Sequence, residues 1–320
     1  MAEKLGYHPD LYARSLRKRQ SKTIGVLAYD TADPFCIPVA RGIEHGLQKA
    51  SYFSLLVNAQ TQRTLFDEYL RMILERRAEG VIVIASWIFE ETNLLADIEK
   101  NHIPIVIVGR DMTEQRVPSI LVDNYRGGSM LVEHLASLGH REIAVIRGPV
   151  EMFDSEPRWK GIEAAAKRLK ISIDSKLVFR LPSLSDSLSS FESGIRIAQE
   201  LLAQREKFTA VLAFDDLTAL GVVRGLAEAG LRIPEDCSVT GFDDILPAHV
   251  ATPGITTIRQ PLENMGLLAT DCILAALTGK SVAKQSEFKL HILEPELVVR
   301  ASTALANRVF HVKGIKKSKG

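Results

Sequence analysis

Cysteine is scarce in this sequence, and long apolar runs are missing from it. The three cysteines, Cys36, Cys237 and Cys272, have no histidine or second cysteine at metal-ligand spacing. We therefore expect reduced thiols in a cytoplasmic protein, with neither a disulfide nor a metal site. The longest apolar runs, at 80–85 and 103–109, are only strand-length and predict no membrane span. No apolar run with a basic flank stands at the start, so we expect no signal peptide.

Catalytic motifs are missing as well. The sequence contains no HExxH, no GxSxG and no GxGxxG after a predicted strand, and its eight histidines are dispersed. The segment "TGKS" at 278–281 lacks the first glycine of a phosphate loop and follows a helix, so Gly279 is predicted to end that helix. We expect a protein that is not an enzyme and needs no cofactor, while a doubly wound enzyme stays open as an alternative.

Strand-like and helix-like segments alternate along the chain. Of the 320 residues 46% are apolar and 25% are charged, with a formal net charge of +1, as in ordinary globular proteins. Short apolar runs separated by segments of helical periodicity are typical of parallel strands covered by helices on both faces. Strands are expected at 23–29, 53–58, 80–85, 103–109, 119–123, 142–148, 177–181, 210–214, 238–242, 288–293 and 295–300. Helices are expected at 38–51, 65–77, 90–101, 127–138, 156–169, 188–204, 217–229 and 262–278.

This alternation restarts near residue 123, which predicts two doubly wound α/β halves of similar size. Apolar segments that remain after residue 243 would complete both sheets if the chain crossed repeatedly between the halves. The predicted fold class is therefore α/β, with two parallel-sheet lobes joined by a multi-strand hinge. A cleft between the lobes would lie at the carboxyl ends of the strands, where ligands bind in open sheets.

Polar side chains stand at these carboxyl ends. They are Asp30, Ser86, Asp111, Asp123, Arg147, Asp215 and Asp243. Aspartate and serine at such positions often cap a helix or stabilise a turn, and this explanation stays open for each of them. The excess of carboxylates over cations nevertheless favours a ligand rich in hydroxyl donors over a phosphate, which would need glycine-rich turns or clustered arginines.

A basic run precedes the first predicted strand. Five cationic residues and no anionic residue lie between Arg14 and Lys22. Because the net charge of the chain is close to zero, any contact with nucleic acid must be local, and this run is the candidate for it. An exposed, mobile linker is the alternative explanation.

The order of several short motifs resembles the lactose/galactose-repressor (LacI/GalR) family of transcriptional regulators. The matching stretches are "AEKLGYHPDLYARSLRKRQSKTIGVLAYD", "VDNYRGGSMLVEHLASLGHREIAVIRGP", "RWKGIEAA", "AFDDLTALGVVRGLAEAGLRIPEDCSVTGFDD", "PGITTIRQP" and "VVRAST". The resemblance extends from about residue 2 to residue 303. It implies a type I periplasmic-binding-protein-like fold with three crossovers, near residues 123, 258 and 292.

The resemblance also implies domain boundaries. Residues 1–22 would be the remnant of a DNA-binding headpiece and its hinge helix, with most of the helix-turn-helix absent from this chain. The N-terminal lobe would comprise residues 23–122 and 259–291, and the C-terminal lobe residues 123–258 and 292–303. Residues 304–320 would form a basic tail, which we expect to be disordered.

Operator DNA is the first partner that the resemblance implies for the full-length protein. In the family, the segment that matches residues 9–19 is a hinge helix formed on the operator. Leu16 would wedge between base steps in the minor groove, while Arg14 and Arg17 would contact phosphates or groove edges. The result would be a ligand-responsive regulator of transcription, most simply a repressor.

A second copy of the chain is the next implied partner, and no membrane partner is expected. The homodimer would form along both lobes, with contributions from residues 38–51 and 72–78. The alternative is that Val39, Ile43 and Leu47 simply pack on their own sheet.

The effector implied by the resemblance is a neutral sugar or similar polyol held between the lobes. Arg158 and Asp243 would be its main polar anchors, because a guanidinium donates and a carboxylate accepts at adjacent hydroxyls. Asp111 would add an acceptor and Phe35 an apolar wall. Asp215 stands where the family usually has asparagine, so it offers only acceptors and argues against an anionic ligand. An ion pair between Arg158 and Asp243 across an empty cleft is the alternative.

A second function stays open beside regulation. A sugar-binding protein of a transport system shares this fold and would also bind its ligand between two lobes. Such a protein would need a secretory signal, and operator binding would separate the two functions.

Overall fold

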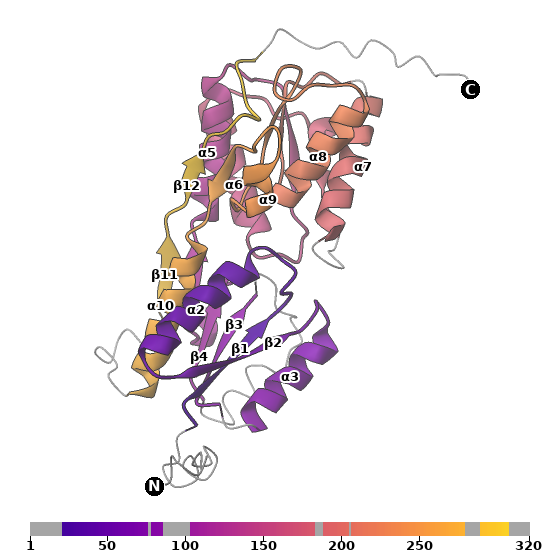
Figure 1. Ribbon diagram of the computed structural model, residues 1–320. Helices are drawn as coiled ribbons and strands as arrows, with labels where there is room; N and C mark the ends of the chain where they lie inside the picture. Colours follow the sequence, from indigo (N-terminus) through magenta and orange to yellow (C-terminus); the bar gives the residue numbers. More distant parts are fainter. Residues whose placement is uncertain are drawn as a thin grey trace, which may run out of the picture.

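The computed structural model describes residues 21–75, 78–85, 103–182, 188–204, 206–278 and 289–306. Two lobes lie one above the other along the long axis of the molecule (Figure 1). Several predictions concern residues outside these ranges: the hinge residues Arg14, Leu16 and Arg17, the polar residue Ser86, the helix at 90–101, the cap at Gly279 and most of the basic tail.

The N-terminal lobe is built on a six-stranded sheet of order β11-β5-β4-β3-β1-β2 in which every pair is parallel. Its strands are β1 (Thr23–Ala28), β2 (Phe53–Asn58), β3 (Gly80–Ile84), β4 (Ile105–Val108), β5 (Ser119–Val122) and β11 (Leu290–Leu293). Every residue of β3 and β4 is buried. Continuous burial of this kind is expected where helices cover both faces of a parallel sheet.

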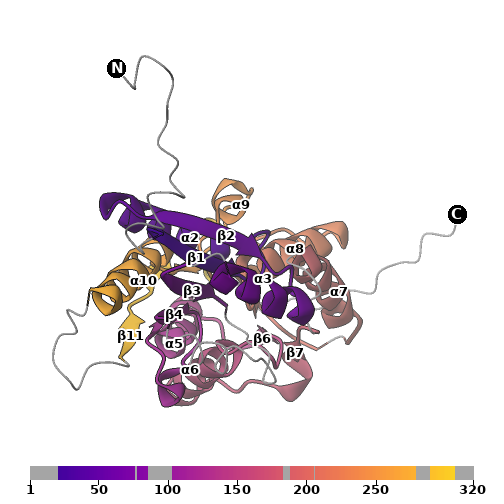
Figure 2. The ribbon, with the colours of Figure 1, turned by 90° about the horizontal axis from the view of Figure 1, so that it is seen from below.

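In the described part of this lobe, three helices cover the sheet: α2 (Cys36–Lys49), α3 (Arg63–Glu75) and α10 (Leu262–Leu277). A Cβ atom at Gly25 of β1 would collide with Ile73 of α3. A Cβ atom at Gly80 of β3 would instead collide with Ile273 of α10. Gly25 pairs with Val81, the residue after Gly80, so the two glycines face opposite sides of the sheet. Helices α3 and α10 therefore cover opposite faces, and α2 packs beside α10 (Figure 2).

The C-terminal lobe has a four-stranded parallel sheet of order β7-β6-β8-β9. Its strands are β6 (Ile143–Arg147), β7 (Val178–Arg180), β8 (Ala210–Leu212) and β9 (Ser238–Thr240). Its helices are α5 (Asn124–Ser137), α6 (Ser155–Arg168), α7 (Leu188–Gln204), α8 (Asp216–Glu228) and α9 (Leu246–Val250). Short 3₁₀ turns, η2 (Thr113–Gln115) and η3 (Ser175–Leu177), complete the two lobes.

Helices of the C-terminal lobe pack in two pairs, α5 on α6 and α7 on α8, and the pairs flank the sheet (Figure 1). Strand β8 divides its side chains between two apolar clusters. Val211 packs in the cluster that contains Leu201 of α7, whereas Leu212 packs in the cluster that contains Leu131 of α5. The alternation along the strand thus gives each helix pair its own core.

The chain crosses between the lobes at three places. The first crossover is at Asp123, between β5 and α5, and the second follows β10 (Thr257–Arg259) and leads into α10. The third lies between β11 and β12 (Glu296–Val298). Strands β10 and β12 pair in antiparallel orientation, so two of the three connections are hydrogen-bonded to each other.

The predicted α/β fold with two parallel sheets is confirmed, and element boundaries moved by a few residues. The helix expected at 127–138 begins at Asn124, because the Asp123 carboxylate accepts a hydrogen bond from the backbone N–H of Arg126 (2.7 Å) and caps the helix earlier. No helix in the described ranges has the length and apolar character needed to cross a membrane.

Candidate ligand-binding site between the lobes

A cavity lies between the lobes at the carboxyl ends of the parallel strands. Both lobes contribute to its walls, and part of the space opens to solvent. The N-terminal lobe lines it with Tyr29, Asp33, Pro34, Phe35, Gly109, Leu121, Val122 and Met265. The C-terminal lobe and the crossovers add Asn124, Met152, Asp154, Arg158, Ser190, Phe214, Asp215, Leu217, Asp243, Ile245 and Gln260.

Arg158, on α6, is buried and held in one orientation. Its Nε and Nη2 both donate to Oδ1 of Asn124 (3.2 and 2.8 Å). Nη2 also donates to Oδ2 of Asp154 (3.0 Å), and Nη1 donates to the backbone carbonyl of Phe214. The guanidinium carbon lies 3.5 Å from the ring centre of Phe242 and 4.4 Å from that of Phe214. Four of the five N–H groups are thus engaged, and one on Nη1 is left for a ligand.

Asp154 stands one helical turn before Arg158. Its Oδ2 accepts the hydrogen bond from Arg158, whereas its Oδ1 is buried and has no hydrogen-bond partner among the described residues. Burial raises the pKa of Asp154, the Arg158 charge lowers it, and the neighbouring Asp215 carboxylate raises it again. A buried acceptor without a partner is unfavourable, so Oδ1 offers a ready position for a ligand donor.

Asp215 caps α8 at the end of strand β8. Its Oδ1 accepts from the backbone N–H of Thr218 (2.6 Å). Burial raises the pKa of Asp215, while hydrogen bonds from Thr218 and Ser190 and the charge of Arg158 lower it. Because a carboxylate has about four acceptor positions, the cap leaves acceptor capacity for the cavity.

Asp243 follows strand β9 with a backbone φ of +118°, a region that residues other than glycine seldom adopt. Its backbone N–H donates to the carbonyl of Ile258 (2.8 Å), and its Oδ1 accepts from Nε2 of Gln260 (2.6 Å). Both partners belong to the second crossover, so the crossover holds Asp243 in its unusual conformation. Burial raises the pKa of Asp243 well above its usual value, and the Arg158 charge opposes this.

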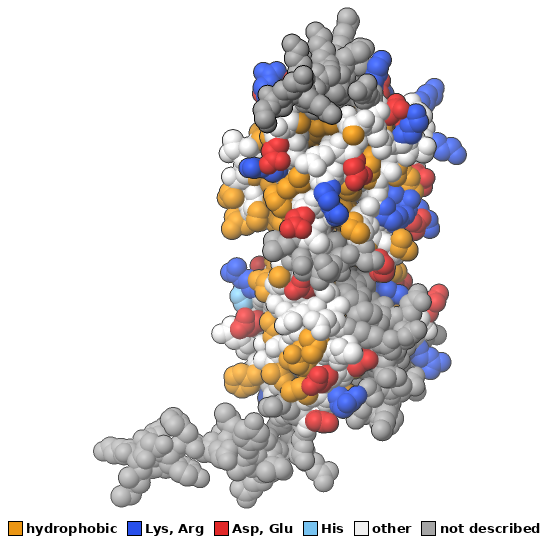
Figure 3. Space-filling model, turned by 90° about the vertical axis from the view of Figure 1, so that its right-hand side faces the viewer, with side chains coloured by type: hydrophobic (Ala, Val, Ile, Leu, Met, Phe, Trp, Pro, Cys, Tyr) orange, Lys and Arg blue, Asp and Glu red, His pale blue; other side chains and the backbone are white. Residues whose placement is uncertain are grey.

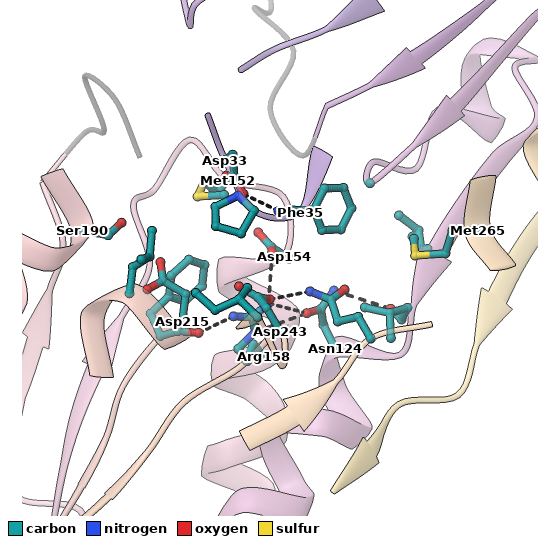
Figure 4. Close-up of a pocket in the computed structure, with 18 of the residues that line it drawn as sticks. Asp33, Phe35, Asn124, Met152, Asp154, Arg158, Ser190, Asp215, Asp243 and Met265 are labelled. Carbon is teal, nitrogen blue, oxygen red and sulfur yellow. Dashed lines mark hydrogen bonds and ion pairs between the residues drawn. The ribbon is translucent and has the colours of Figure 1, made fainter. Parts of the chain in front are cut away.

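The N-terminal lobe presents Asp33 and Phe35 on the loop before α2 (Figure 4). The Asp33 carboxylate accepts from the hydroxyl of Tyr29 and from the backbone N–H of Phe35 (2.7 Å). Burial raises the pKa of Asp33 to about 6, although these hydrogen bonds lower it. The charge of Asp215, in the other lobe, raises it as well.

Four of the five residues proposed from sequence for the effector line this cavity: Phe35, Arg158, Asp215 and Asp243. The fifth, Asp111, is not part of the lining. Its Oδ1 accepts from the backbone N–H (2.9 Å) and the hydroxyl (2.7 Å) of Thr113, so it stabilises the η2 turn. The turn explanation left open for Asp111 is therefore the one that the structure shows.

The alternative ion pair between Arg158 and Asp243 is not formed within the described part of the chain. Arg158 pairs with Asp154, and Asp243 pairs with Gln260. Local roles also account for three other polar residues at strand ends. Asp30 accepts from the N–H of Ala32, Asp123 caps α5, and Arg147 pairs with Glu156 (2.8 Å) and lies over the Trp159 ring.

Sequence reasoning missed Asp33, Asn124, Asp154 and Ser190. Asp154 carried a usable signal, because it lies four residues before Arg158 and just ahead of the helix predicted at 156–169, a spacing at which opposite charges can meet. Asp33 and Asn124 carried none, because only the docking of the lobes brings them to the same cavity. Across the described ranges, no group of three or more His, Cys, Asp or Glu side chains is arranged to hold a metal ion.

The fold and its cleft define a periplasmic-binding-protein-like domain. Residues 132–303, more than half of the chain, match the family model of that description. The transcriptional repressor PurR of Edwardsiella ictaluri is 32% identical over 305 residues, which cover 94% of this chain and 86% of the relative. The ribose operon repressor of Haemophilus influenzae is 30% identical over 299 residues, 93% of this chain and 86% of the relative.

A solved structure supports the same relationship. A LacI family transcriptional regulator from Enterococcus faecium, crystallised with bound ribose, has a TM-score of 0.76 and 30% sequence identity. The match covers 89% of this chain and 100% of the other. The chain belongs to the LacI family of transcriptional regulators.

Proposed function

We propose that this chain is the effector-binding and dimerising core of a ligand-responsive, DNA-binding repressor. The observation that carries the proposal is the cavity between the lobes, to which both lobes contribute polar side chains. A molecule bound there contacts both lobes, so its affinity differs between their possible arrangements and shifts the equilibrium between them. The relatives are transcriptional repressors over nearly the whole chain, which favours a regulator over a transport protein.

The effector class that fits this cavity is a sugar or related polyol. Asp154, Asp215 and Asp243 offer acceptors for hydroxyl donors, while Arg158 keeps a single N–H for a ligand oxygen. Phe35, Phe214 and Leu217 supply apolar walls for the carbon face of a ring. An anion would meet several carboxylates and one largely engaged guanidinium, so electrostatics disfavour a sugar phosphate.

Operator contact is proposed for the segment that precedes β1. On this proposal Leu16 enters the minor groove, and Arg14 and Arg17 neutralise phosphates, which makes the affinity dependent on salt. On the face of the core drawn in Figure 3, acidic and basic side chains of the described residues are interspersed over both lobes. A mixed surface of this kind does not attract DNA by itself, so the contact is assigned to the basic segment.

The homodimer is proposed to form along both lobes, with α2 and the end of α3 contributing. Val39, Ile43 and Leu47 of α2 are buried in the core of their own lobe, so they are not available to a partner. The outward apolar residues of these helices are Ile37 (50% exposed) and Met72 (37% exposed). These two side chains are the ones that a second copy would cover.

A ligand panel tests the proposed effector class. Thermal shift with sugars, polyols, nucleobases and sugar phosphates should show stabilisation by members of the first two classes. For a ligand that binds, the melting temperature should rise as the concentration of free ligand increases relative to its Kd. Stabilisation by a purine or a phosphorylated compound alone would show that the polyol proposal is wrong.

Arg158→Met provides the matching variant test. The side chain of methionine keeps apolar contact with Phe214 and Phe242 but donates no hydrogen bond, so ligand-induced stabilisation should disappear. The control is Arg232→Met, because Arg232 also forms an ion pair with an aspartate four residues away, Asp236, but does not line the cavity. The control variant should respond to ligand like the unmodified protein.

A further inference from the structure

Carboxyl groups outnumber cationic groups among the described residues that line the cavity. Of the described residues, four carboxylic acids line it, Asp33, Asp154, Asp215 and Asp243, together with one cation, Arg158. The guanidinium forms its ion pair with Asp154 (3.0 Å). Among the described contacts, the other three carboxylates receive hydrogen bonds from neutral donors: a tyrosine hydroxyl, backbone N–H groups and a glutamine amide. A neutral polyol would bring no positive charge to these four carboxyl groups.

A second observation points into the same cavity. Oδ1 of Asp154 is shielded from solvent and lacks a hydrogen-bond partner within the described chain, although Oδ2 of the same group is paired with Arg158. In Figure 4 the Asp154 carboxylate lies between Arg158 and the loop that carries Asp33 and Phe35. The carboxyl group that carries this oxygen lines the cavity that both lobes share.

We propose that the effector is an amino polyol, such as an amino sugar or amino alditol, and that Asp154 binds its protonated amine. This inference rests on the proposed function, because it selects one class among the polyols that the cavity accepts. It also departs from the neutral ligand expected from sequence. The reason is that the structure adds Asp33 and Asp154 to the cavity wall and removes no carboxylate except Asp111.

An ammonium group matches the carboxyl groups of this cavity better than a hydroxyl group does. It carries three N–H donors and a positive charge, whereas a hydroxyl offers one neutral donor. One donor would satisfy Oδ1 of Asp154, and the charge would reduce the repulsion between Asp33 of one lobe and Asp215 of the other. Since those two residues belong to different lobes, an amine between them would bridge the lobes.

Matched probe pairs test this inference. D-glucose is compared with D-glucosamine, D-galactose with D-galactosamine, and D-sorbitol with 1-amino-1-deoxysorbitol, by titration calorimetry at pH 7. N-acetylglucosamine serves as the probe that keeps the nitrogen but loses the charge. In any pair that binds, the amine should bind about tenfold more tightly than its parent, because charge-assisted hydrogen bonds are roughly twice as strong as neutral ones.

Asp154→Asn removes the charge while keeping the size of the side chain. The variant should lose about tenfold more affinity for the amine than for the parent polyol, so that the preference for the amine disappears. Asp236→Asn is the matched control, since Asp236 also pairs with an arginine four residues away but is not part of the cavity lining. The control should keep the preference.

The outcomes separate this inference from the function on which it rests. Equal affinity for amine and parent, tighter binding of the N-acetyl compound, or an equal loss of both ligands in Asp154→Asn would overturn the amine assignment and leave the polyol proposal standing. If no member of any pair bound, the proposed polyol function itself would be contradicted. A preference for the amine that vanishes in Asp154→Asn supports both.

Discussion

The carboxylate of Asp216 accepts a hydrogen bond from the hydroxyl of Thr257, with 2.6 Å between Oδ1 and Oγ1. Its Oδ2 accepts from the backbone N–H of Ile245 (2.9 Å). Asp216 begins α8, whereas Thr257 begins β10, the strand that leads back to the N-terminal lobe. A fully buried acid with only neutral partners therefore joins the C-terminal lobe to its hinge.

This buried acid makes stability depend on pH. Burial raises the pKa of Asp216 from 3.8 to about 7, although the two hydrogen bonds lower it. A folded pKa above the unfolded one means that folding favours the protonated acid. The contribution to stability is complete below the unfolded pKa and is lost as the pH rises through 7. We expect the contribution of Asp216 to the free energy of unfolding to fall by roughly 2 kcal/mol between pH 5 and pH 8. Asp33, with its pKa raised to about 6, adds a change of the same sign.

Asp216→Asn should remove most of this dependence, because the amide can accept from Ile245 and donate to Thr257 without ionising. Urea unfolding at pH 5, 6, 7 and 8 measures the effect. Asp236→Asn is the control, since Arg232 holds the pKa of Asp236 below its usual range and the group stays ionised in this window. If Asp216→Asn followed the same pH curve as the unmodified protein, Asp216 would not be the cause.

Asp215→Asn tests the role of a carboxylate at the α8 cap. Asparagine caps helices about as well as aspartate, so the N–H of Thr218 keeps its acceptor and the apo protein should change by less than about 1 kcal/mol. The amide NH₂ would face a hydroxyl donor of the ligand at a position where the carboxylate offered an acceptor. Ligand affinity should therefore fall about tenfold. Denaturant unfolding and calorimetry with the best ligand of the panel give the two values.

Asp123→Asn is the matched control for this cap. Asp123 caps α5 through the N–H of Arg126, in the same way that Asp215 caps α8, but it does not line the cavity. Its replacement should leave ligand affinity unchanged. Equal binding by Asp215→Asn and the unmodified protein would instead remove Asp215 from the site.

Gly266→Ala tests the close contact between α10 and α2. A Cβ atom at Gly266 would lie 2.1 Å from the backbone oxygen of Val39, which cannot move aside without shifting the helix. We expect a loss of about 3 kcal/mol in the free energy of unfolding. Gly254→Ala should cost less than about 1 kcal/mol, because its nearest atom is the flexible Cδ of Arg300 at 3.2 Å. Chemical denaturation that ranked the two variants in the opposite order would contradict this packing.

Light scattering at micromolar concentration should give the mass of a dimer. Met72→Glu would place a charge on the proposed interface and should shift the mass toward that of a monomer while the circular dichroism spectrum stays unchanged. Val150→Glu, at an exposed position (75%) outside α2 and α3, should remain dimeric. A monomer mass for the unmodified protein would refute the dimer proposal.

Much of the fold was predictable because its signals are local. Continuous apolar runs such as 80–85 identify strands buried on both faces, and α7 has the predicted bounds of 188–204. The start of α5 was predicted three residues too late. The prediction followed the apolar periodicity of the segment, whereas the cap at Asp123 sets where the helix begins. The resemblance to the LacI/GalR family supplied what periodicity alone does not, namely the number of crossovers and the residues expected at the cleft.

The sequence by itself determined the two α/β lobes and the placement of polar residues at the ends of strands, because both follow from the order of apolar and polar residues along the chain. Only the tertiary structure decided which of these carboxylates meet. Asp111 and Asp215 each follow an apolar run, yet Asp111 stabilises its own turn whereas Asp215 lines the cavity with Asp33 and Asp154. The difference arises because the docking of the lobes brings residues from distant segments close enough to interact electrostatically. The spacing of residues within one segment does not reveal which distant segments will meet.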